Sequence, residues 1–516
     1  MSEILYPIGI QDFEEIRRLG FVYVDKTRHI HELARTGKYY FLSRPRRFGK
    51  SLLISTMEAY FSGRKELFKG LAMEKLEKDW TAYPVLHLDL NARNYDEEAS
   101  LVIELNKHLE KWEALYGDNY KDRSVEERFF HIVEQAFQKI GQRVVVLIDE
   151  YDKPLLQTIG NENLQDKYRS QLKAFYSVLK SQDRYIHFAF LTGVTKFSKV
   201  SVFSDLNNLK DISMNAKYID ICGMTEAEIH RYFEPALYEF AEAIGKTYEE
   251  TCLMLKEQYD GYHFTMNSPG IYNPFSLLNA LQDKGLNDYW FETGTPTFLV
   301  QLLKESDYNL ERLCDEEQET SVLNSMEHLR ENPIPVLYQS GYLTIRDHDP
   351  EFGTYKLGFP NKEVKTGFIK YLLPYYLPAD NSASILTMNN FVRDVRRGDP
   401  ETFMRRMQAF FANTNYKIVG EMEKYFHNAL YLVFTMMGFY TEVERNTSWG
   451  SIDIVVKTKD YIYLIECKLD SSAKDAIQQI VDKNYAAPYA MDPRRLFKIG
   501  VNFSSKTRGI DDYLIQ

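Results

Sequence analysis

The stretch "YYFLSRPRRFGKSLLIS", Tyr39–Ser55, decides how the first part of this chain is expected to fold. "YYFLS" has the apolar run of a buried strand, and "SLLISTMEAYF" has the pattern of a following helix. "GKS" at positions 49–51 ends a phosphate-binding loop, in which backbone N–H groups and a lysine contact phosphates and a hydroxyl faces Mg²⁺. The sequence therefore predicts a strand, a nucleotide loop and a helix in this order.

The loop departs from the usual spacing at its first glycine, where this chain has Arg44 followed by Pro45. The change removes a residue that adopts the tight left-handed turn easily, and the proline removes one N–H donor. Arg46 and Arg47 are expected to compensate by bringing guanidinium groups to the phosphates. The predicted nucleotide contacts along the loop are Arg46, Arg47, Phe48, Gly49, Lys50, Ser51 and Leu52, with Ser51 also a Mg²⁺ ligand.

A second element supports a nucleotide site. In "VVVLIDEYDKP" a buried strand ends at Asp149, and the carboxyl ends of such strands are where open α/β sheets bind ligands. Asp149 is expected to hold Mg²⁺, and Glu150 to orient or deprotonate the attacking water. The plainer alternative is a buried strand that runs into an acidic turn. A third strand, "FAFLTGVTKFS", carries Thr192 and Thr195 at its end, and either hydroxyl is a candidate sensor of the γ-phosphate, although threonine at a strand end is usually structural.

The wider pattern predicts several domains, because 516 residues exceed the roughly 150 that one core usually holds. Strands alternating with helices predict a parallel α/β sheet covered on both faces. "TEAE" at Thr225 is a capping-box helix start, and Val336–Phe359 reads as a hairpin after a helix, which suits a winged-helix-like appendage. The predicted division is 1–224, the α/β core; 225–378, a helical and winged region; 379–414, a helical linker whose arginines indicate a solvated face rather than a nucleic-acid contact; and 415–516, a second α/β domain.

Composition limits the partners and the compartment that the sequence predicts. The formal net charge of -11 argues against a globally basic nucleic-acid coat, so any DNA or RNA contact must be local. The four cysteines are scattered and form no CxxC pair, which is typical of a reducing compartment. No segment approaches the roughly 20 apolar residues of a membrane span. We expect a cytoplasmic protein without a membrane partner.

The C-terminal part carries a second candidate site. Asp453 lies in "GSIDIVV", and Glu466 and Lys468 lie in "LIECKL". Two carboxylates suit a hard divalent cation, and a lysine can orient the attacking hydroxide or stabilise phosphorane charge. Residues i and i+2 of a strand share a face, so Glu466 and Lys468 point together. A hairpin centred between Thr458 and Lys459 would place Asp453 opposite Leu464 on that same face, with Asp453 and Glu466 as the metal ligands.

Several strings together resemble one family. "FVYVDKT", "RPRRFGKS", "LIDEYDKPL", "LTGVTKFSKVSVFSDLNNLKDIS", "YDGYHF", "YNPFSLLN" and "YWFETGTPTFL" are similar to the AAA-ATPase-like bacterial proteins with a C-terminal PD-(D/E)XK nuclease-superfamily domain. The resemblance covers essentially the whole chain, and that family itself has arginine in place of the first loop glycine. It implies ATP and Mg²⁺ as cofactors, with Lys50, Ser51, Asp149 and Glu150 in the nucleotide-site roles. It also implies that Asp25 and Lys26 of "VDKT" lie near the nucleotide.

The resemblance adds residues around the nuclease-like site. Glu423 on the helix before the strands is implied as an accessory carboxylate with His427 as a helper, although a glutamate on a helix face is more often solvated. Gln479 on the following helix is implied to point back at the site, with Tyr485 nearby. Ser451 stands where a basic residue is expected, which puts cleavage in question. Cys467 lies between Glu466 and Lys468 in the sequence, so its side chain faces the opposite side of the strand, and we expect it to be part of the core.

Two readings remain open at this point. The first is an ATP-regulated nuclease that cuts DNA or RNA with Mg²⁺, or with Mn²⁺, at Asp453, Glu466 and Lys468. The second is a nucleotide-switch or scaffold NTPase whose nuclease-like domain binds a partner without cutting. A homo-oligomer is compatible with both, since an arginine finger could come from Arg46, Arg47 or a neighbouring subunit.

Overall fold

The computed structural model describes residues 5–196, 208–292, 299, 302–303, 306, 308–314, 317–323, 332–376, 381–412, 422–438, 442–448 and 451–516. The chain divides into two compact units, one made of Met1–Leu302 and Cys314–Val364 and the other of Leu303–Leu313 and Lys365–Gln516. The boundary near 364 falls inside helix α16 (Lys362–Tyr376), and the four-part division of the sequence stays a prediction.

The first unit contains the parallel α/β sheet that the sequence predicts. Its strand order is β2-β3-β4-β1-β5, and each neighbouring pair is parallel. Every residue of β1 and β3 is buried, which explains their unbroken apolar runs, because a sheet covered on both faces has no solvent side. The strands are β1 (Tyr39–Ser43), β2 (Val85–Asp89), β3 (Val144–Asp149), β4 (Ile186–Gly193) and β5 (Lys210–Asp211).

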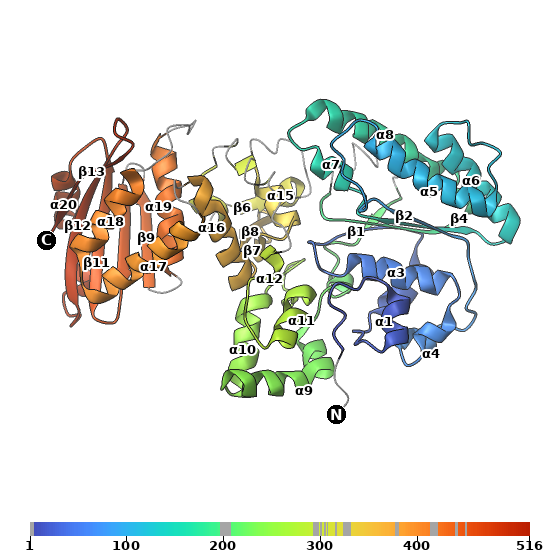
Figure 1. Cartoon of the computed structure of the whole chain (residues 1–516), viewed down its shortest axis with the longest axis horizontal. Coiled ribbons are helices and arrows are strands. Elements are labelled where there is room, and N and C mark those ends of the chain that lie inside the picture. The colour runs from blue at the N-terminus through green and yellow to red at the C-terminus, as the bar shows by residue number, and fades with distance from the viewer. Residues whose placement is uncertain are drawn as a thin grey trace. The chain divides into compact units, whose positions relative to one another are not determined.

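Helices cover both faces of this sheet. Figure 1 shows α5, α6 and α8 on one side and α1, α3 and α4 on the other. This arrangement leaves the carboxyl ends of the strands open as an edge at which loops meet. The helices are α1 (Phe13–Leu19), α2 (Thr27–Thr36), α3 (Lys50–Phe61), α4 (Ala72–Leu76), α5 (Ser100–Tyr116), α6 (Val125–Ile140), α7 (Lys153–Gln157) and α8 (Glu162–Ser181), with short 3-10 helices at Lys65–Phe68, Asp183–Tyr185 and Ala216–Tyr218.

The middle of the chain is mostly helical. The capping box predicted at Thr225 is present: its hydroxyl accepts from the backbone N–H of Glu228 at 3.2 Å, and Glu228 accepts from the backbone N–H of Thr225 at 2.9 Å. A small antiparallel sheet of order β6-β8-β7 includes the hairpin expected after a helix. The elements are α9 (Glu226–Ile244), α10 (Tyr248–Tyr259), α11 (Pro274–Asp283), α12 (Tyr289–Glu292), η4 (Leu310–Cys314), β6 (Glu317–Glu319), α14 (Thr320–Leu323), α15 (Ile334–Gln339), β7 (Thr344–Asp349) and β8 (Thr354–Gly358).

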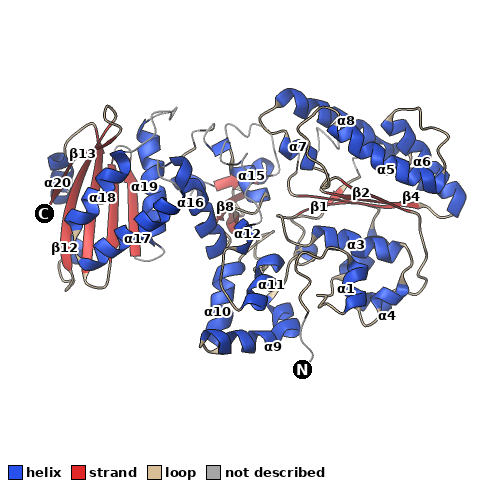
Figure 2. Ribbon diagram, in the orientation of Figure 1, coloured by secondary structure: helices blue, strands red, loops and turns tan. Residues whose placement is uncertain are grey.

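The second unit is built on a mixed sheet of order β13-β12-β11-β10-β9, in which only β11 and β12 are parallel. Figure 2 shows α17 and α18 across one face of it. On the other face, α20 packs Ile477 and Ile480 on Ile462 and Leu464 of β11. The elements are α17 (Asn381–Arg397), α18 (Pro400–Ala412), α19 (Met422–Gly438), β9 (Glu442–Ser448), β10 (Ser451–Lys457), β11 (Tyr461–Leu469), α20 (Ala473–Asp482), η5 (Ala487–Tyr489), β12 (Arg495–Ser504) and β13 (Gly509–Ile515).

Among the described residues, no helix is at once long enough and apolar enough to cross a lipid bilayer.

A glycine lets α20 lie directly on this sheet. A Cβ at Gly500 of β12 would lie 2.3 Å from the carbonyl oxygen of Ala473 and 2.9 Å from Cγ1 of Ile477. We therefore expect Gly500→Ala to lower the unfolding free energy by about 1–3 kcal/mol, because the added methyl forces backbone apart. Calorimetric unfolding of the full chain measures the loss.

Gly438→Ala in the same unit is the matched control, since the nearest atom to its added Cβ is Val443 Cβ at 3.9 Å. This change should leave the unfolding free energy unchanged or raise it slightly, because alanine favours a helix. Equal losses in both variants would contradict the close approach as the cause.

Candidate functional site

The loop between β1 and α3 makes its left-handed turns later than the usual spacing suggests. Gly49, which precedes α3, has φ +91°, and Arg47 has φ +66°. The sequence placed the missing turn at the first glycine, and the structure instead moves the turning residues to positions 47 and 49. The backbone can therefore reverse direction before α3 without a glycine at position 44.

Arg44 takes no part in the open face of the loop. Its guanidinium is buried and donates to the carbonyl oxygens of Ser43 at 2.9 Å, Ser213 at 2.8 Å and Tyr218 at 3.0 Å. Its carbon Cζ lies 3.9 Å from the centre of the Phe264 ring. Burial lowers the pKa of Arg44 to about 10, against smaller opposing contributions from acidic groups. The residue that replaces the glycine thus anchors the loop to Ser213, Tyr218 and Phe264.

Lys50 is the charged centre of the loop. Its Nζ donates to the carbonyl oxygens of Arg44 at 3.1 Å and Pro45 at 3.2 Å, and it forms an ion pair with Glu150 Oε1 at 3.1 Å. The lysine is buried, whereas Glu150 is half-buried. Glu150 has φ +53°, a left-handed conformation that is uncommon for a residue with a Cβ and that turns the chain sharply after β3. Two predicted site residues, far apart in sequence, are therefore in direct contact.

Asp149 sits at the end of β3, next to strand β4. Its carboxylate accepts hydrogen bonds from the hydroxyls of Thr192 and Ser51. Burial and the nearby Glu150 raise the pKa of Asp149, and these two hydroxyls and Lys50 partly offset the rise. Three predicted residues, Ser51, Asp149 and Thr192, are thus brought together as a set of oxygen donors of the kind that Mg²⁺ prefers.

Asp152 was missed by the sequence reasoning. It is fully buried and accepts from the backbone N–H groups of Val194 and Thr195 and from the Thr195 hydroxyl. Thr195 is therefore engaged by Asp152. A Cβ at Gly193 would lie 2.5 Å from Asp152 Oδ1, so the close approach requires glycine there. Two features of the sequence could have indicated this contact: Asp152 is the third acidic residue of "DEYD", and the polar turn "TGVT" at 192–195 offers donors at the end of the neighbouring strand.

Asp25 and Lys26 have different surroundings. Asp25 accepts from the backbone N–H and the hydroxyl of Thr27 at 2.9 and 2.7 Å, and from the backbone N–H of Ala72 at 2.7 Å. These bonds tie down the starts of α2 and α4. Lys26 instead lines the cavity beside the loop, where its Nζ contacts both carboxylate oxygens of Glu228 at 2.6 and 2.7 Å. Of the pair, only Lys26 lines the cavity.

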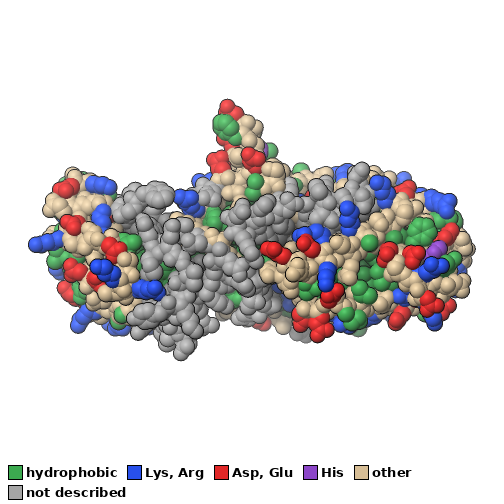
Figure 3. Space-filling model, turned by 90° about the horizontal axis from the view of Figure 1, so that it is seen from above, with side chains coloured by type: hydrophobic (Ala, Val, Ile, Leu, Met, Phe, Trp, Pro, Cys, Tyr) green, Lys and Arg blue, Asp and Glu red, His purple; other side chains and the backbone are tan. Residues whose placement is uncertain are grey.

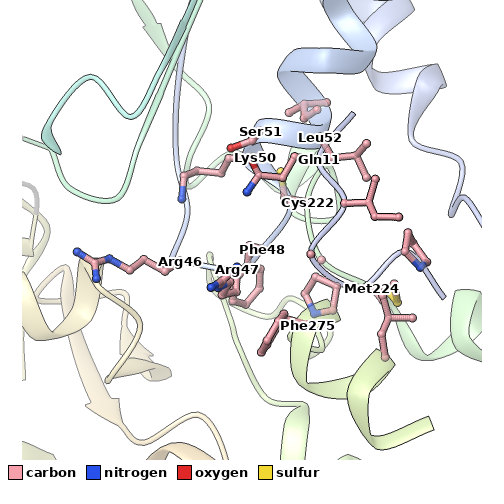
Figure 4. Close-up of a pocket in the computed structure, with 18 of the residues that line it drawn as sticks. Gln11, Arg46, Arg47, Phe48, Lys50, Ser51, Leu52, Cys222, Met224 and Phe275 are labelled. Atoms are coloured by element: carbon pink, nitrogen blue, oxygen red, sulfur yellow. The ribbon is translucent and has the colours of Figure 1, made fainter. Parts of the chain in front are cut away.

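A cavity of about 490 Å³ opens beside the loop. One part is lined by polar loop residues that include Gly49, Lys50 and Ser51, together with Glu150 and Lys153. In Figure 4, Arg47 lies beside Phe48 and Phe275, while Arg46 extends away from the other labelled side chains. The apolar part of the wall comes from the N-terminal segment, from Met224 just before α9, and from α9 and α11. Its side chains include Ile8, Val24, Met224, Phe233, Phe275 and Leu278.

In the second unit the hairpin register differs from the predicted one. Asp453 pairs with Glu466, not with Leu464, because the turn is centred one residue later than predicted. A shift of two positions leaves the face unchanged, since side chains alternate with period two. Asp453 and Glu466 therefore sit directly opposite each other on neighbouring strands. The side chain of Asp453 lies outside those that the structure describes, and so do the side chains of Ser451, Glu423 and His427.

Glu466 is 1% exposed, and neither of its carboxylate oxygens has a hydrogen-bond donor among the described residues. Lys468 Nζ lies 3.5 Å from Glu466 Oε1 and donates to Gln479 Oε1 of α20. The structure thus brings Glu466, Lys468 and Gln479 together. Tyr485 packs beside the apolar cluster under α20, and Cys467 is buried on the opposite face of the strand.

Surface charge is mixed on the side that Figure 3 shows. Over α5, α6 and α8, Lys and Arg side chains are interspersed with Asp and Glu. The described part of that face therefore carries no single basic patch.

Comparisons with known proteins agree with this architecture. Residues 7–203 match the family described as "Predicted AAA-ATPase", and residues 421–513 match the PD-(D/E)XK nuclease superfamily. An uncharacterized protein in the vnfD 5′ region of Azotobacter chroococcum mcd 1 is 35% identical over 529 residues, which span 100% of this chain and 99% of the relative. The chain belongs to the family of AAA-ATPase-like proteins with a C-terminal PD-(D/E)XK nuclease-superfamily domain. Its two matched domains give it an ATPase-like part and a nuclease-like part.

The buried Asp152 generates a pH prediction. Burial and the neighbouring Glu150 raise the pKa of Asp152 to about 6, above the roughly 3.9 of an unfolded aspartate. The folded state then holds a proton that the unfolded chain releases, so this group's contribution to stability falls as pH rises from about 4 to 6 and is flat above. Asp152→Asn cannot ionise, and it should gain about 1–2 kcal/mol relative to wild type between pH 4.5 and 7.5.

Thermal unfolding of both proteins across that pH range measures the difference. Asp211→Asn is the control, because the pKa of Asp211 is shifted in the opposite direction. Burial would raise it, but Lys196 and Ser213 outweigh burial and lower it. Its stability difference from wild type should stay constant over this range. A constant difference for Asp152→Asn as well would contradict a raised pKa.

Proposed function

We propose that this protein binds and hydrolyses ATP at the cavity beside Lys50, and that the nucleotide state regulates a metal-dependent nuclease centred on Glu466 and Lys468. The observation that carries the proposal is the contact between Lys50 and Glu150 at the polar end of a 490 Å³ cavity. The loop lysine, the acidic strand end and a space of nucleotide size coincide there.

The cavity fits a nucleotide in its chemistry as well as its size. Its polar end offers backbone N–H groups at the start of α3, the Lys50 ammonium and the Ser51 hydroxyl, which suit phosphates. Its apolar wall, with Phe275 and Met224, suits a flat base. We assign the phosphates to the first end and the adenine to the second.

The residues of the polar end have distinct proposed roles. Lys50 would exchange its two carbonyl partners for phosphate oxygens, since a charged acceptor forms a stronger bond than a neutral carbonyl, and its ion pair with Glu150 would open. Glu150, released from the lysine, is placed to orient the attacking water. Ser51 and Asp149, with Thr192 behind them, would hold Mg²⁺, which when bound neutralises charge on the phosphates. An arginine finger would come from Arg46, Arg47 or a neighbouring copy in a homo-oligomer.

The nuclease assignment rests on Glu466. A buried carboxylate without a donor is costly unless a cation neutralises it, and among the described side chains the Lys468 ammonium is its cationic neighbour, 3.5 Å away. Glu466 with Asp453 opposite it would hold Mg²⁺ or Mn²⁺, which when bound supplies an activated hydroxide. Lys468, oriented by Gln479, would stabilise charge on the phosphate, and Glu423 would be an accessory carboxylate. We propose DNA or RNA as the substrate.

A second candidate function is a nucleotide switch whose nuclease-like domain binds without cutting. The formal net charge of -11 and the serine at position 451 favour it, because cleavage usually needs local positive charge near the phosphate. Both candidates place the protein in the cytoplasm, where the free thiols of Cys222, Cys252 and Cys467 would stay reduced.

The nucleotide assignment is tested through Lys50. Lys50→Ala should weaken ATP binding about 10- to 100-fold, because charge-assisted bonds of roughly 1.5–3 kcal/mol are lost. Titration calorimetry with Mg-ATP measures the dissociation constant. The control is Lys38→Ala, which removes a surface lysine paired with Asp183 at 2.7 Å and should leave binding unchanged. Equal binding by wild type and Lys50→Ala would refute the site.

The nuclease assignment is tested by cleavage of single- and double-stranded DNA and RNA with Mg²⁺ or Mn²⁺, with and without ATP. Glu466→Gln should abolish cutting, because an amide binds a hard cation far more weakly than a carboxylate. Glu442→Gln, at an exposed residue paired with Lys457, is the control and should cut normally. If wild type cuts nothing but binds ATP, the switch function is the correct one.

A further inference from the structure

The most unusual group beside the proposed nucleotide site is the buried cation of Arg44. Among the residues that the structure describes, no carboxylate lies within ion-pairing distance of it. Its two terminal nitrogens instead donate to three backbone carbonyl oxygens, two of which belong to Ser213 and Tyr218, and the guanidinium lies over the face of Phe264. Its Nε is buried without a hydrogen-bond partner among the described residues. A glycine at this position would need none of these partners.

The rest of the loop is also held by residues far along the chain. Phe48 packs edge-on against Tyr262 and Phe264, with ring centres 4.8 and 5.6 Å apart. The backbone N–H of Gly223 donates to the Phe48 carbonyl at 3.1 Å, and Trp290 Nε1 donates to the Arg46 carbonyl at 3.2 Å. Each partner follows β5 in the sequence, so the loop's shape depends on the middle of the chain.

The contacts of Lys50 connect this anchoring to the phosphate end. Its Nζ is held by the carbonyl oxygens of Arg44 and Pro45. Both residues are held in place: the Arg44 side chain is bonded to Ser213 and Tyr218, and the ring of Pro45 lies so close to Gly341 that an added Cβ there would be 2.6 Å from Pro45 Cβ. A movement of the segment 213–218 or of the aromatic pair would therefore shift the carbonyls that hold the lysine.

We infer that Arg44 is a positioning residue that couples Lys50 to the segments 213–218 and 262–264, so that nucleotide binding and the order of these segments depend on each other. The inference rests on the proposed nucleotide function and goes beyond it, because it says where the nucleotide's effect is transmitted first. It also reverses the expectation from the motif: restoring the glycine should damage the site.

The first measurement is nucleotide affinity. Arg44→Gly should bind Mg-ATP at least about 10-fold more weakly than wild type, and Arg44→Lys should lose a similar factor, since an ammonium cannot serve three carbonyls in a fork. The matched control is Arg17→Ala, which also removes a guanidinium bonded to backbone carbonyls, those of Leu67 and Lys69, and should bind normally.

The second measurement separates coupling from a merely structural role. Hydrogen exchange of the full chain at saturating Mg-ATP should show protection of wild-type residues 213–218 and 262–264 as well as of the loop. In Arg44→Gly the loop and the end of β3 should still gain protection, while the two distant segments should not. If Arg44→Gly does not fold, Arg44→Lys is read in the same way.

The outcomes are distinguishable. Wild type that binds no nucleotide would refute the proposed function, and this inference with it. Wild type that binds, together with a glycine or lysine variant that binds equally well or keeps the distant protection, would overturn the inference alone.

Discussion

Three carboxylates within four residues at the end of one buried strand set the constraint around which the first unit is organised. Burial raises the pKa of Asp149 and of Asp152, and the carboxylate of Glu150 raises both further. Each is stabilised by a different neighbour: hydroxyls for Asp149, Lys50 for Glu150, and the backbone of the β4 turn for Asp152. The phosphate loop and the end of β4 are thereby drawn to the same edge of the sheet.

A comparable constraint shapes the second unit, where the buried carboxylate of Glu466 lies at a close backbone approach. Gly500 lies beside Glu466 in the parallel pair β11 and β12. Since it has no side chain, α20 can descend onto the sheet at that point and bring Gln479 to Lys468. Glu466 and Gly500 therefore lie side by side: the first supplies a carboxylate, and the second leaves the space that α20 occupies.

Local patterns in the sequence were sufficient for the sheet and for much of both sites. Apolar runs identify β1 and β3 because both faces are covered, and alternation places Glu466 and Lys468 on one face whatever the register. The register itself was predicted wrongly by two residues, because it depends on which residues form the turn. The role of Arg44 was not predictable from its neighbours in sequence, and that of Asp152 required comparison with the turn after β4, since the partners of both residues are supplied by tertiary packing.

The wide sequence separation of Arg44 from its partners has a consequence for biosynthesis. Two of its carbonyl partners lie 169 and 174 residues further along the chain, and Phe264 lies further still. At roughly 5–20 residues per second, a ribosome needs on the order of 10–40 s to make the chain between the loop and these partners. For that time the nascent loop has its lysine but not the scaffold that holds it, so the nucleotide pocket is completed late in translation.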